Sequence, residues 1–176
     1  YKAASPRFNI FFIMSCYTLT DKSMEININC DLGEKSKYHS NKNDPDLLSI
    51  VNSANVACGY HAGDEESMNQ EVQISKKMGV SIGAHPSFND PDNFGRKRMN
   101  LPASEIKKLI RDQYEILENI ADNHGETVTH IKPHGALNNM ACEDMDLATI
   151  IAKSIKELNA DLIYFCLLYT SDAADE

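Results

Sequence analysis

Short apolar runs alternate with longer segments of helical periodicity along most of this chain of 176 residues. The first run, residues 25–32, alternates apolar and polar side chains as a half-buried strand does. We predict further strands at 54–60, 80–84, 127–131 and 161–165. Strands that alternate with helices form a parallel sheet, because each helix carries the chain back to the start of the next strand. The sequence therefore predicts an α/β fold.

Helix signals fill the segments between the predicted strands. We expect a short helix from Asp44 and longer helices at 64–79, 102–125 and 144–158. Asp64 is the predicted N-cap of the first long helix, and Gly79 is its predicted stop. The polar segment 87–101 is predicted to be a long loop. No dinucleotide or phosphate-loop fingerprint follows any strand, and periodicity alone allows either an open sheet or a barrel.

Composition and charge exclude several kinds of partner. The net charge of −9 argues against nucleic acid, because phosphate backbones are bound by clustered Lys and Arg. No window holds the roughly 18 apolar residues that a membrane helix needs, so we expect no membrane partner. The five cysteines include no CxxC pair. They fit reduced, buried thiols in the cytoplasm better than a disulfide framework, so we predict a cytoplasmic protein.

Polar side chains that can bind a metal ion or transfer a proton lie at the ends of four of the predicted strands. In chain order they are Asp31, Glu34, His61, Asp64, His85, Lys132 and His134. The C-terminal ends of parallel strands meet at one face of the sheet, and active sites are built there. We therefore expect these side chains to share one site.

Asp31, His61 and His85 are the predicted metal ligands. One carboxylate and two imidazoles from three neighbouring strands suit a divalent ion that keeps positions open for water and substrate. Such an ion lowers the pKa of its bound water or polarises an amide carbonyl. A turn-forming aspartate and two histidines that bond local backbone groups are the alternative interpretation.

Lys132, His134, Glu34 and Asp64 are the predicted catalytic residues. Lys132 and His134 lie two apart and point to the same face, where the lysine would hold an anionic group. His134 would be a general acid or base, or a further ligand. Glu34 and Asp64 would be bases, or partners that orient a histidine. Surface or turn residues are the alternative, and Asp64 is already explained as a helix cap.

Three further assignments concern single residues. Arg96 lies in the long loop and is expected to engage an anion, with a solvated arginine as the alternative. Cys58 paired with a histidine would be a nucleophile, which is a minority interpretation. His39 and His124 are assigned to solvent.

Five stretches of the sequence resemble the LamB/YcsF family. They are residues 29–34 (NCDLGE), 53–64 (SANVACGYHAGD), 83–87 (GAHPS), 93–96 (NFGR) and 132–137 (KPHGAL). The resemblance implies a TIM-like (β/α) barrel of the glycoside hydrolase/deacetylase type. It implies cleavage of the cyclic amide of 5-oxo-L-proline to L-glutamate with ATP hydrolysis, as the A component of a complex with B and C subunits. Asn55, Arg96 and Lys132 are then expected to bind substrate.

The two ends depart from this resemblance. We interpret 1–23 as a non-native upstream leader, because Met24 directly precedes the first strand. Residues 166–176 resemble a translated sequencing adapter, which leaves 24–165 as a barrel domain incomplete at its C-terminus. Such a domain exposes apolar faces, so we expect the chain as it stands to be poorly stable and inactive.

Two other functions remain open from the sequence. One is a stand-alone metal-dependent deacetylase or amidohydrolase acting on a carbohydrate or another small amide, which needs no ATP. The other is a non-catalytic subunit whose pocket only holds the substrate.

Overall fold

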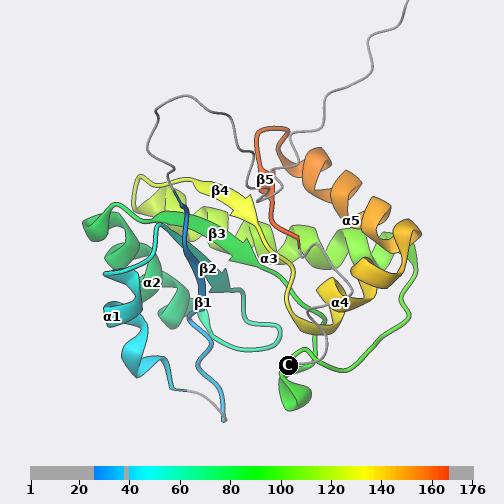
Figure 1. Ribbon diagram of the computed structural model, residues 1–176, viewed down its shortest axis with the longest axis horizontal. Helices are drawn as coiled ribbons and strands as arrows, with labels where there is room; N and C mark the ends of the chain where they lie inside the picture. Colours follow the sequence, from blue (N-terminus) through cyan, green and yellow to red (C-terminus); the bar gives the residue numbers. More distant parts are fainter. Residues whose placement is uncertain (1–25, 38–39, 167–176) are drawn as a thin grey trace, which may run out of the picture.

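The computed structural model describes residues 26–37 and 40–166, and its centre is a five-stranded parallel sheet (Figure 1). The strands are β1 (Asn29–Leu32), β2 (Ser53–Ala57), β3 (Ser81–His85), β4 (Val128–Ile131) and β5 (Ile163–Tyr164). This confirms the predicted α/β class. β1 is shorter than predicted, since pairing with β2 begins at Asn29. The predicted leader and all but the first residue of the predicted tail lie outside the described residues.

The strands pair in sequence order, β1-β2-β3-β4-β5, and every pair is parallel. A doubly wound sheet reverses its order at a switch point, whereas a barrel adds each strand on the same side of the last. The order is therefore that of a (β/α) barrel. β1 and β5 do not pair with each other within the described residues, so the barrel is not closed.

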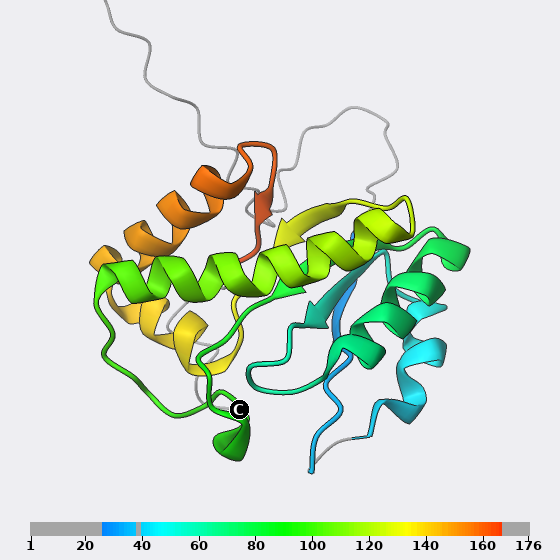
Figure 2. The same cartoon turned by 180° about the vertical axis from the view of Figure 1, so that it is seen from behind.

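Helices and two short turns of 3₁₀ helix connect the strands. The helices are α1 (Asp44–Leu48), α2 (Glu65–Met78), α3 (Ala103–Asn123), α4 (Gly135–Glu143) and α5 (Met145–Leu158), and the 3₁₀ turns are Asn41–Asn43 and Pro91–Asn93. α3 crosses behind the sheet in Figure 1 and faces the reader in Figure 2, with α5 beside it. No helix in the described part of the chain is long and apolar enough to span a membrane.

The ends of α2 follow from its sequence. Asp64 Oδ1 accepts a hydrogen bond from the Ser67 backbone N–H at 2.8 Å, and Ser67 Oγ lies 2.8 Å from the Asp64 backbone nitrogen. This reciprocal pair is a capping box. Gly79 then ends the helix in the left-handed conformation, with φ 69°. The predicted cap and stop are both confirmed.

Helix α4 is absent from the sequence prediction. It spans only nine residues and directly follows the turn after β4, with His134 as an N-cap that makes no side-chain cap bond. Two and a half turns are too short to show a clear apolar period. Asp144 ends α4 and caps α5 by accepting from the backbone N–H of Leu147 at 3.2 Å, so β4 is followed by two helices.

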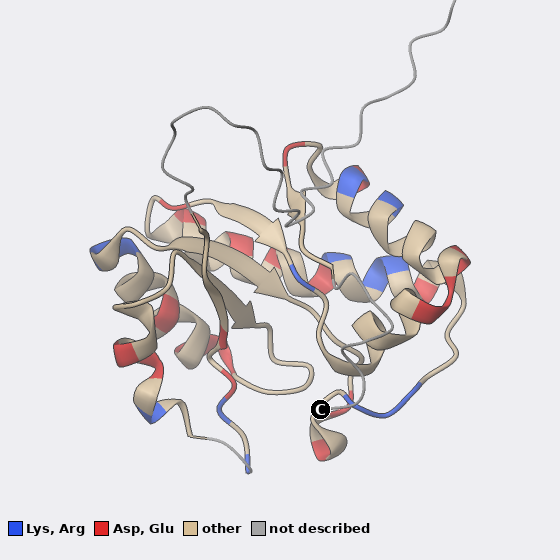
Figure 3. Cartoon of the chain, viewed as in Figure 1, with Lys and Arg blue, Asp and Glu red and all other residues tan. Residues whose placement is uncertain are grey.

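The main core lies between the sheet and the helices. Val56, Ile82 and Ile131 of the strands pack against a buried face that includes Ile110 and Leu117 of α3. Charged residues gather on the helices and loops, and the strands are nearly free of them (Figure 3). This is the pattern of a sheet covered by helices, because a charge in that layer would lose its hydration.

Candidate metal centre

Four side chains meet at the C-terminal ends of the strands. Glu34 Oε1 lies 3.2 Å from His61 Nε2, 3.5 Å from His134 Nδ1 and 3.9 Å from His85 Nε2. His134 Nδ1 lies 2.9 Å from His85 Nε2. One donor atom from each residue lies within 4.8 Å of all the others. The three imidazoles are buried, and the Glu34 side chain is 19% exposed. We call these four residues the carboxylate–histidine cluster.

The tautomer of His61 is set by Ser87. The Ser87 hydroxyl donates its hydrogen to the Phe88 carbonyl at 2.9 Å, so its oxygen accepts from His61 Nδ1 at 2.9 Å. Nε2 of His61 therefore carries a lone pair toward the cluster. Gln113, fully buried on α3, holds Ser87 in place by bonding both its backbone N–H and its carbonyl.

Backbone carbonyls set the tautomers of the other two histidines. His85 Nδ1 donates to the Lys132 carbonyl at 2.5 Å, and His134 Nε2 donates to the Phe94 carbonyl at 3.0 Å. A carbonyl oxygen only accepts, so each of these nitrogens carries the hydrogen. Nε2 of His85 and Nδ1 of His134 are then lone pairs that face each other.

The cluster therefore consists of acceptors alone. Three imidazole lone pairs and one carboxylate oxygen point to a common centre, and each histidine is oriented by a protein oxygen behind it. Acceptors at 2.9 to 3.9 Å repel unless a cation lies between them. Neighbouring ligands of a tetrahedral zinc ion lie about 3.3 Å apart when metal–ligand bonds are about 2.0–2.1 Å long. The donor set and its spacing thus fit a divalent cation, with the orientation by outer partners that metal-binding histidines usually have.

Burial favours the neutral form of two of the cluster histidines. Burial lowers the pKa of His61, and it lowers the pKa of His134 to about 3 with help from the neighbouring histidines. Burial alone would raise the pKa of Glu34, but the neighbouring His61, His85 and His134 hold it below its usual value. Neutral imidazoles and an ionised carboxylate are the forms that bind metal ions.

Asp31 and Lys132 form an ion pair beside the cluster. Lys132 Nζ lies 2.6 Å from Asp31 Oδ1, and Asp31 Oδ2 lies 3.4 Å from His85 Nε2. Burial would raise the pKa of Asp31, but the neighbouring His85 and Lys132 outweigh it and lower that pKa. Both side chains are part-exposed, so a small molecule can reach them. The structure thus places Asp31 next to the imidazoles, with Glu34 in their midst.

The loop after β3 closes the cluster from one side. Phe94 adopts the left-handed conformation with φ 55°, which is uncommon for a residue other than glycine. This turns its carbonyl toward His134 and its ring edge-on to His61, with centroids 5.3 Å apart. At Gly95 a Cβ atom would lie 2.9 Å from His61 Cβ, so only glycine allows this approach. Arg96 is exposed and lies over the Phe94 ring, 5.4 Å from its centroid.

Several predicted residues lie elsewhere. Asp64 caps α2 and pairs with Lys35 at 3.6 Å, outside the cluster. Asn55 is fully buried, and its amide is bonded to protein groups. His124, assigned to solvent, is only part-exposed and bonds Asn69 at 2.7 Å, whereas His39 lies outside the described residues.

None of the cysteines in the described part of the chain belongs to the cluster. Cys58 is buried, and burial raises its pKa to about 12, so its thiol stays protonated. This contradicts the minority interpretation of a nucleophile, because the thiolate is the reactive form. Of the other described cysteines, Cys30 and Cys142 are part-exposed and Cys166 is exposed, so the predicted burial holds only for Cys58.

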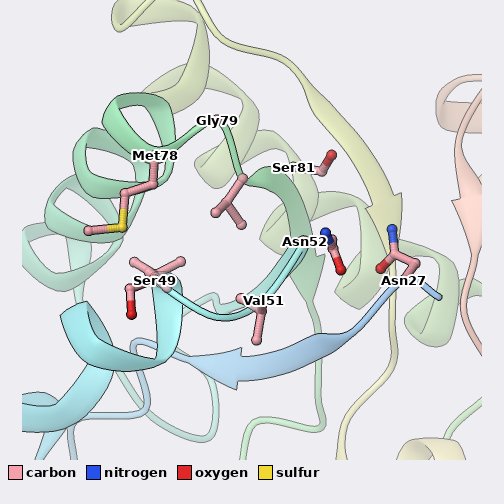
Figure 4. Close-up of a pocket in the computed structure, with 9 residues that line it drawn as sticks. Asn27, Ser49, Val51, Asn52, Met78, Gly79 and Ser81 are labelled. Carbon is pink, nitrogen blue, oxygen red and sulfur yellow. The ribbon is translucent and has the colours of Figure 1, made fainter. Parts of the chain in front are cut away.

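A pocket lies at the N-terminal ends of the strands, opposite the carboxylate–histidine cluster (Figure 4). It has a volume of about 580 Å³ and is lined by Leu48, Val51, Met78 and Val80 with small polar residues between them. No titratable side chain lines it. In barrels of this kind the N-terminal end of the strands contributes to stability, and chemistry occurs at the other end.

Fold and site together define an α/β protein whose parallel strands carry a carboxylate–histidine metal-type centre at their C-terminal ends. The chain belongs to the LamB/YcsF family, whose model matches residues 26–175. This confirms the resemblance seen in its motifs.

The chain is also similar in sequence to curated proteins. It is 44% identical over 145 residues to the A subunit of 5-oxoprolinase from Nitrobacter hamburgensis, covering 82% of this chain and 57% of that protein. It is 41% identical over 140 residues to the A subunit of 5-oxoprolinase from Staphylococcus carnosus, covering 80% of this chain and 56% of that protein. The chain spans just over half the length of these curated relatives.

A solved structure supports the fold. The crystal structure of the lactam utilization protein from Thermus thermophilus superposes with a TM-score of 0.78 at 34% identity. The match covers 84% of this chain and 60% of that protein.

Proposed function

We propose that this chain is part of the A subunit of an ATP-dependent 5-oxoprolinase, which cleaves the cyclic amide of 5-oxo-L-proline to L-glutamate. The names of two relatives at 41% and 44% identity support this activity. The observation that carries the chemical part is the convergence of three imidazole lone pairs and one carboxylate at the strand ends. The proposed cofactors are ATP and a divalent cation, and the proposed setting is the cytoplasm.

The proposed metal ligands are Glu34, His61, His85 and His134. This set keeps the two predicted histidines and replaces Asp31 with Glu34 and His134, because their donor atoms converge. A divalent cation held there would polarise the amide carbonyl and lower the pKa of a bound water. The outer partners of the histidines keep the lone pairs aimed inward, so the site is arranged before any ligand arrives.

Asp31 and Lys132 are the proposed catalytic pair. Opening the lactam adds water to the carbonyl carbon, breaks the C–N bond and delivers a proton to the departing nitrogen. We assign these proton transfers to Asp31, which is part-exposed beside the cluster, so it would accept a proton from the water and return it to the nitrogen. Lys132 stabilises negative charge on the substrate carboxylate or on the carbonyl oxygen. Arg96, exposed at the rim of the cluster, is the proposed second anion contact.

ATP and the partner subunits complete the proposal. A five-membered lactam is a stable amide, and transfer of the terminal phosphoryl group of ATP to its carbonyl oxygen, with ADP leaving, would make it reactive. Water would then open the ring to an acyl phosphate, and a second water would release phosphate and leave glutamate. No phosphate-loop fingerprint follows any strand of this sequence. We propose that ATP binds at a junction with the B and C subunits or in a loop that carries no known phosphate-binding motif.

The test uses this subunit at the full length of its relatives, purified with the B and C subunits, because the chain as it stands is expected to be inactive. Glutamate release and ADP release are measured with 5-oxoproline, and bound metal is measured by elemental analysis. His85→Ala and Glu34→Gln are expected to lose metal and at least about 100-fold in turnover, since each removes a ligand. His124→Ala is the matched control, because it removes an imidazole that bonds Asn69 on the outer helices. Full turnover in both ligand variants would refute the proposed site.

The ligand types of the cluster also support an alternative function, that of a metal-dependent amide hydrolase acting alone. The cluster has the ligand types of metal-dependent amide hydrolases, which need no nucleotide. A stand-alone deacetylase or amidohydrolase would therefore turn over without ATP. Glutamate formation that is independent of ATP, or turnover of an N-acetylated sugar, would favour that function.

A further inference from the structure

His130 is a buried histidine outside the cluster, and the arrangement of the sheet explains its place. Asp31, Asn55, Gly83 and His130 are register partners, one on each of the strands β1 to β4. A Cβ atom at Gly83 would lie 2.1 Å from the His130 ring, so this row has room for the imidazole only because position 83 lacks a side chain. His130 Nε2 therefore reaches across β3 to Asn55 Oδ1, at 3.0 Å.

A local irregularity aims the ring. The pairing of β3 with β4 shifts between Ile82 and Gly83, so Thr129 is an extra residue on β4. Such bulges re-aim the next side chain and are frequent beside active sites. Phe165 stacks on the ring with centroids 4.5 Å apart. His130 is thus held on both faces, and 1% of it is exposed.

The hydrogen bonds of this row have a fixed direction. Asp31 Oδ1 accepts from Lys132 Nζ at 2.6 Å, and the Asn55 amide nitrogen donates to the same oxygen and to Asn29 Oδ1, at 2.8 Å each. The Asn55 oxygen then faces His130, which must carry its hydrogen on Nε2. Nδ1 is left as an acceptor. The Thr129 hydroxyl lies 2.9 Å from Nδ1 and 3.1 Å from the Ile82 carbonyl, so in this arrangement its single hydrogen must go to Nδ1. The direction therefore runs from His130 through Asn55 to Asp31.

We infer that His130 is a positioning residue, which keeps the Asn55 amide turned so that its nitrogen holds Asp31 in place beside Lys132. This rests on the proposed function of the Asp31–Lys132 pair. Asn55 is fully buried, so without the Nε2 hydrogen its oxygen would have no partner. Its nitrogen would still bond Asp31 and Asn29, but the amide would be held from one end only, and its hold on Asp31 beside the lysine would loosen. His130 therefore acts on Asp31 through the Asn55 amide that lies between them.

Two variants of similar size test this role. In His130→Gln the amide nitrogen stands close to the position of Nε2, and in His130→Asn it stands close to Nδ1. Both lose the ring between Gly83 and Phe165, so a purely structural role predicts the same effect for both. A positioning role predicts that the glutamine variant retains function and the asparagine variant does not.

The first readout is hydrogen exchange of the Asn55 side-chain amide, followed by NMR in the purified protein and assigned with Asn55→Ser. We expect slow exchange in the wild type and in His130→Gln, and exchange at least tenfold faster in His130→Asn. The second readout is kcat/KM, which should fall about 10- to 100-fold in His130→Asn and stay within about threefold in His130→Gln. Co²⁺ affinity should be unchanged in both variants, because the cluster is separate.

Equal behaviour of the two variants in the exchange experiment would overturn the inference. A wild-type ring with its hydrogen on Nδ1, seen in a long-range ¹H–¹⁵N spectrum, would overturn it without any variant and therefore also if a variant fails to fold. If the wild type shows no turnover while the exchange pattern is as expected, the proposed function fails and the positioning role stands.

Discussion

A buried pair of acids lies beneath the loop that carries Glu34. Glu71 on α2 is 2% exposed and shares a hydrogen bond with Asp44. Asp44 Oδ2 in turn accepts from the backbone N–H of Gly33 at 2.9 Å. Two carboxyl groups this close share a proton, because they cannot both be ionised without solvent. Burial, then the charge of Asp44, raises the pKa of Glu71 to about 8.

This raised pKa makes stability depend on pH. The folded state holds a proton on the pair that the unfolded chain, with an ordinary pKa of 4.5, has already released. The resulting stability is present below pH 4.5 and is lost as the pH rises through 8. With these two pKa values, the free energy of unfolding should fall by about 3 kcal/mol between pH 6 and pH 9.

Glu71→Gln should remove this dependence. The glutamine amide can donate to Asp44 and does not titrate, so the variant should gain about 3 kcal/mol over the wild type between pH 6 and pH 9. Urea unfolding followed by circular dichroism at pH 6, 7, 8 and 9 measures the difference, and titrations common to both proteins cancel. Glu115→Gln, an exposed change on α3, is the control and should run parallel to the wild type. Parallel curves for Glu71→Gln and the wild type would refute the shared proton.

Three further changes have defined outcomes. Ser87→Ala removes the acceptor for His61 Nδ1 and should weaken Co²⁺ binding about 10- to 100-fold in a competition titration. Gly83→Ala would place a Cβ 2.1 Å from the His130 ring and should cost about 3 kcal/mol in urea unfolding. Arg98→Ala breaks an exposed pair with Glu143 and should change stability by less than about 0.5 kcal/mol.

Each outcome has a result that would contradict it. Wild-type Co²⁺ affinity in Ser87→Ala would show that the serine does not orient the imidazole. An unchanged unfolding midpoint in Gly83→Ala would mean that His130 is not packed on this glycine. A loss above about 1 kcal/mol in Arg98→Ala would mean that the surface pair is part of a larger network.

The sequence by itself determined the order of the predicted strands and helices and the two ends of α2. Strand periodicity, the Asp64 cap and the Gly79 stop are local signals, and each depends on residues within a few positions of one another. The same reasoning placed the functional residues at the strand ends, because parallel strands end at one face. It missed α4, whose two and a half turns carry too weak a period to be recognised.

Only the tertiary structure decided which of these residues form the cluster. Asp31, His61 and His85 looked equivalent along the chain, yet Glu34 and His134 converge with the two histidines while Asp31 pairs with Lys132. The partners that set each tautomer come from the loop after β3 and from the residue that follows β4, far in the sequence from the histidines they orient. His130 and Gly83 depend on contact across strands in the same way. The orientation and hydrogen bonding of side chains at a site depend on residues that are neighbours in space, and a local sequence pattern does not show which residues those are.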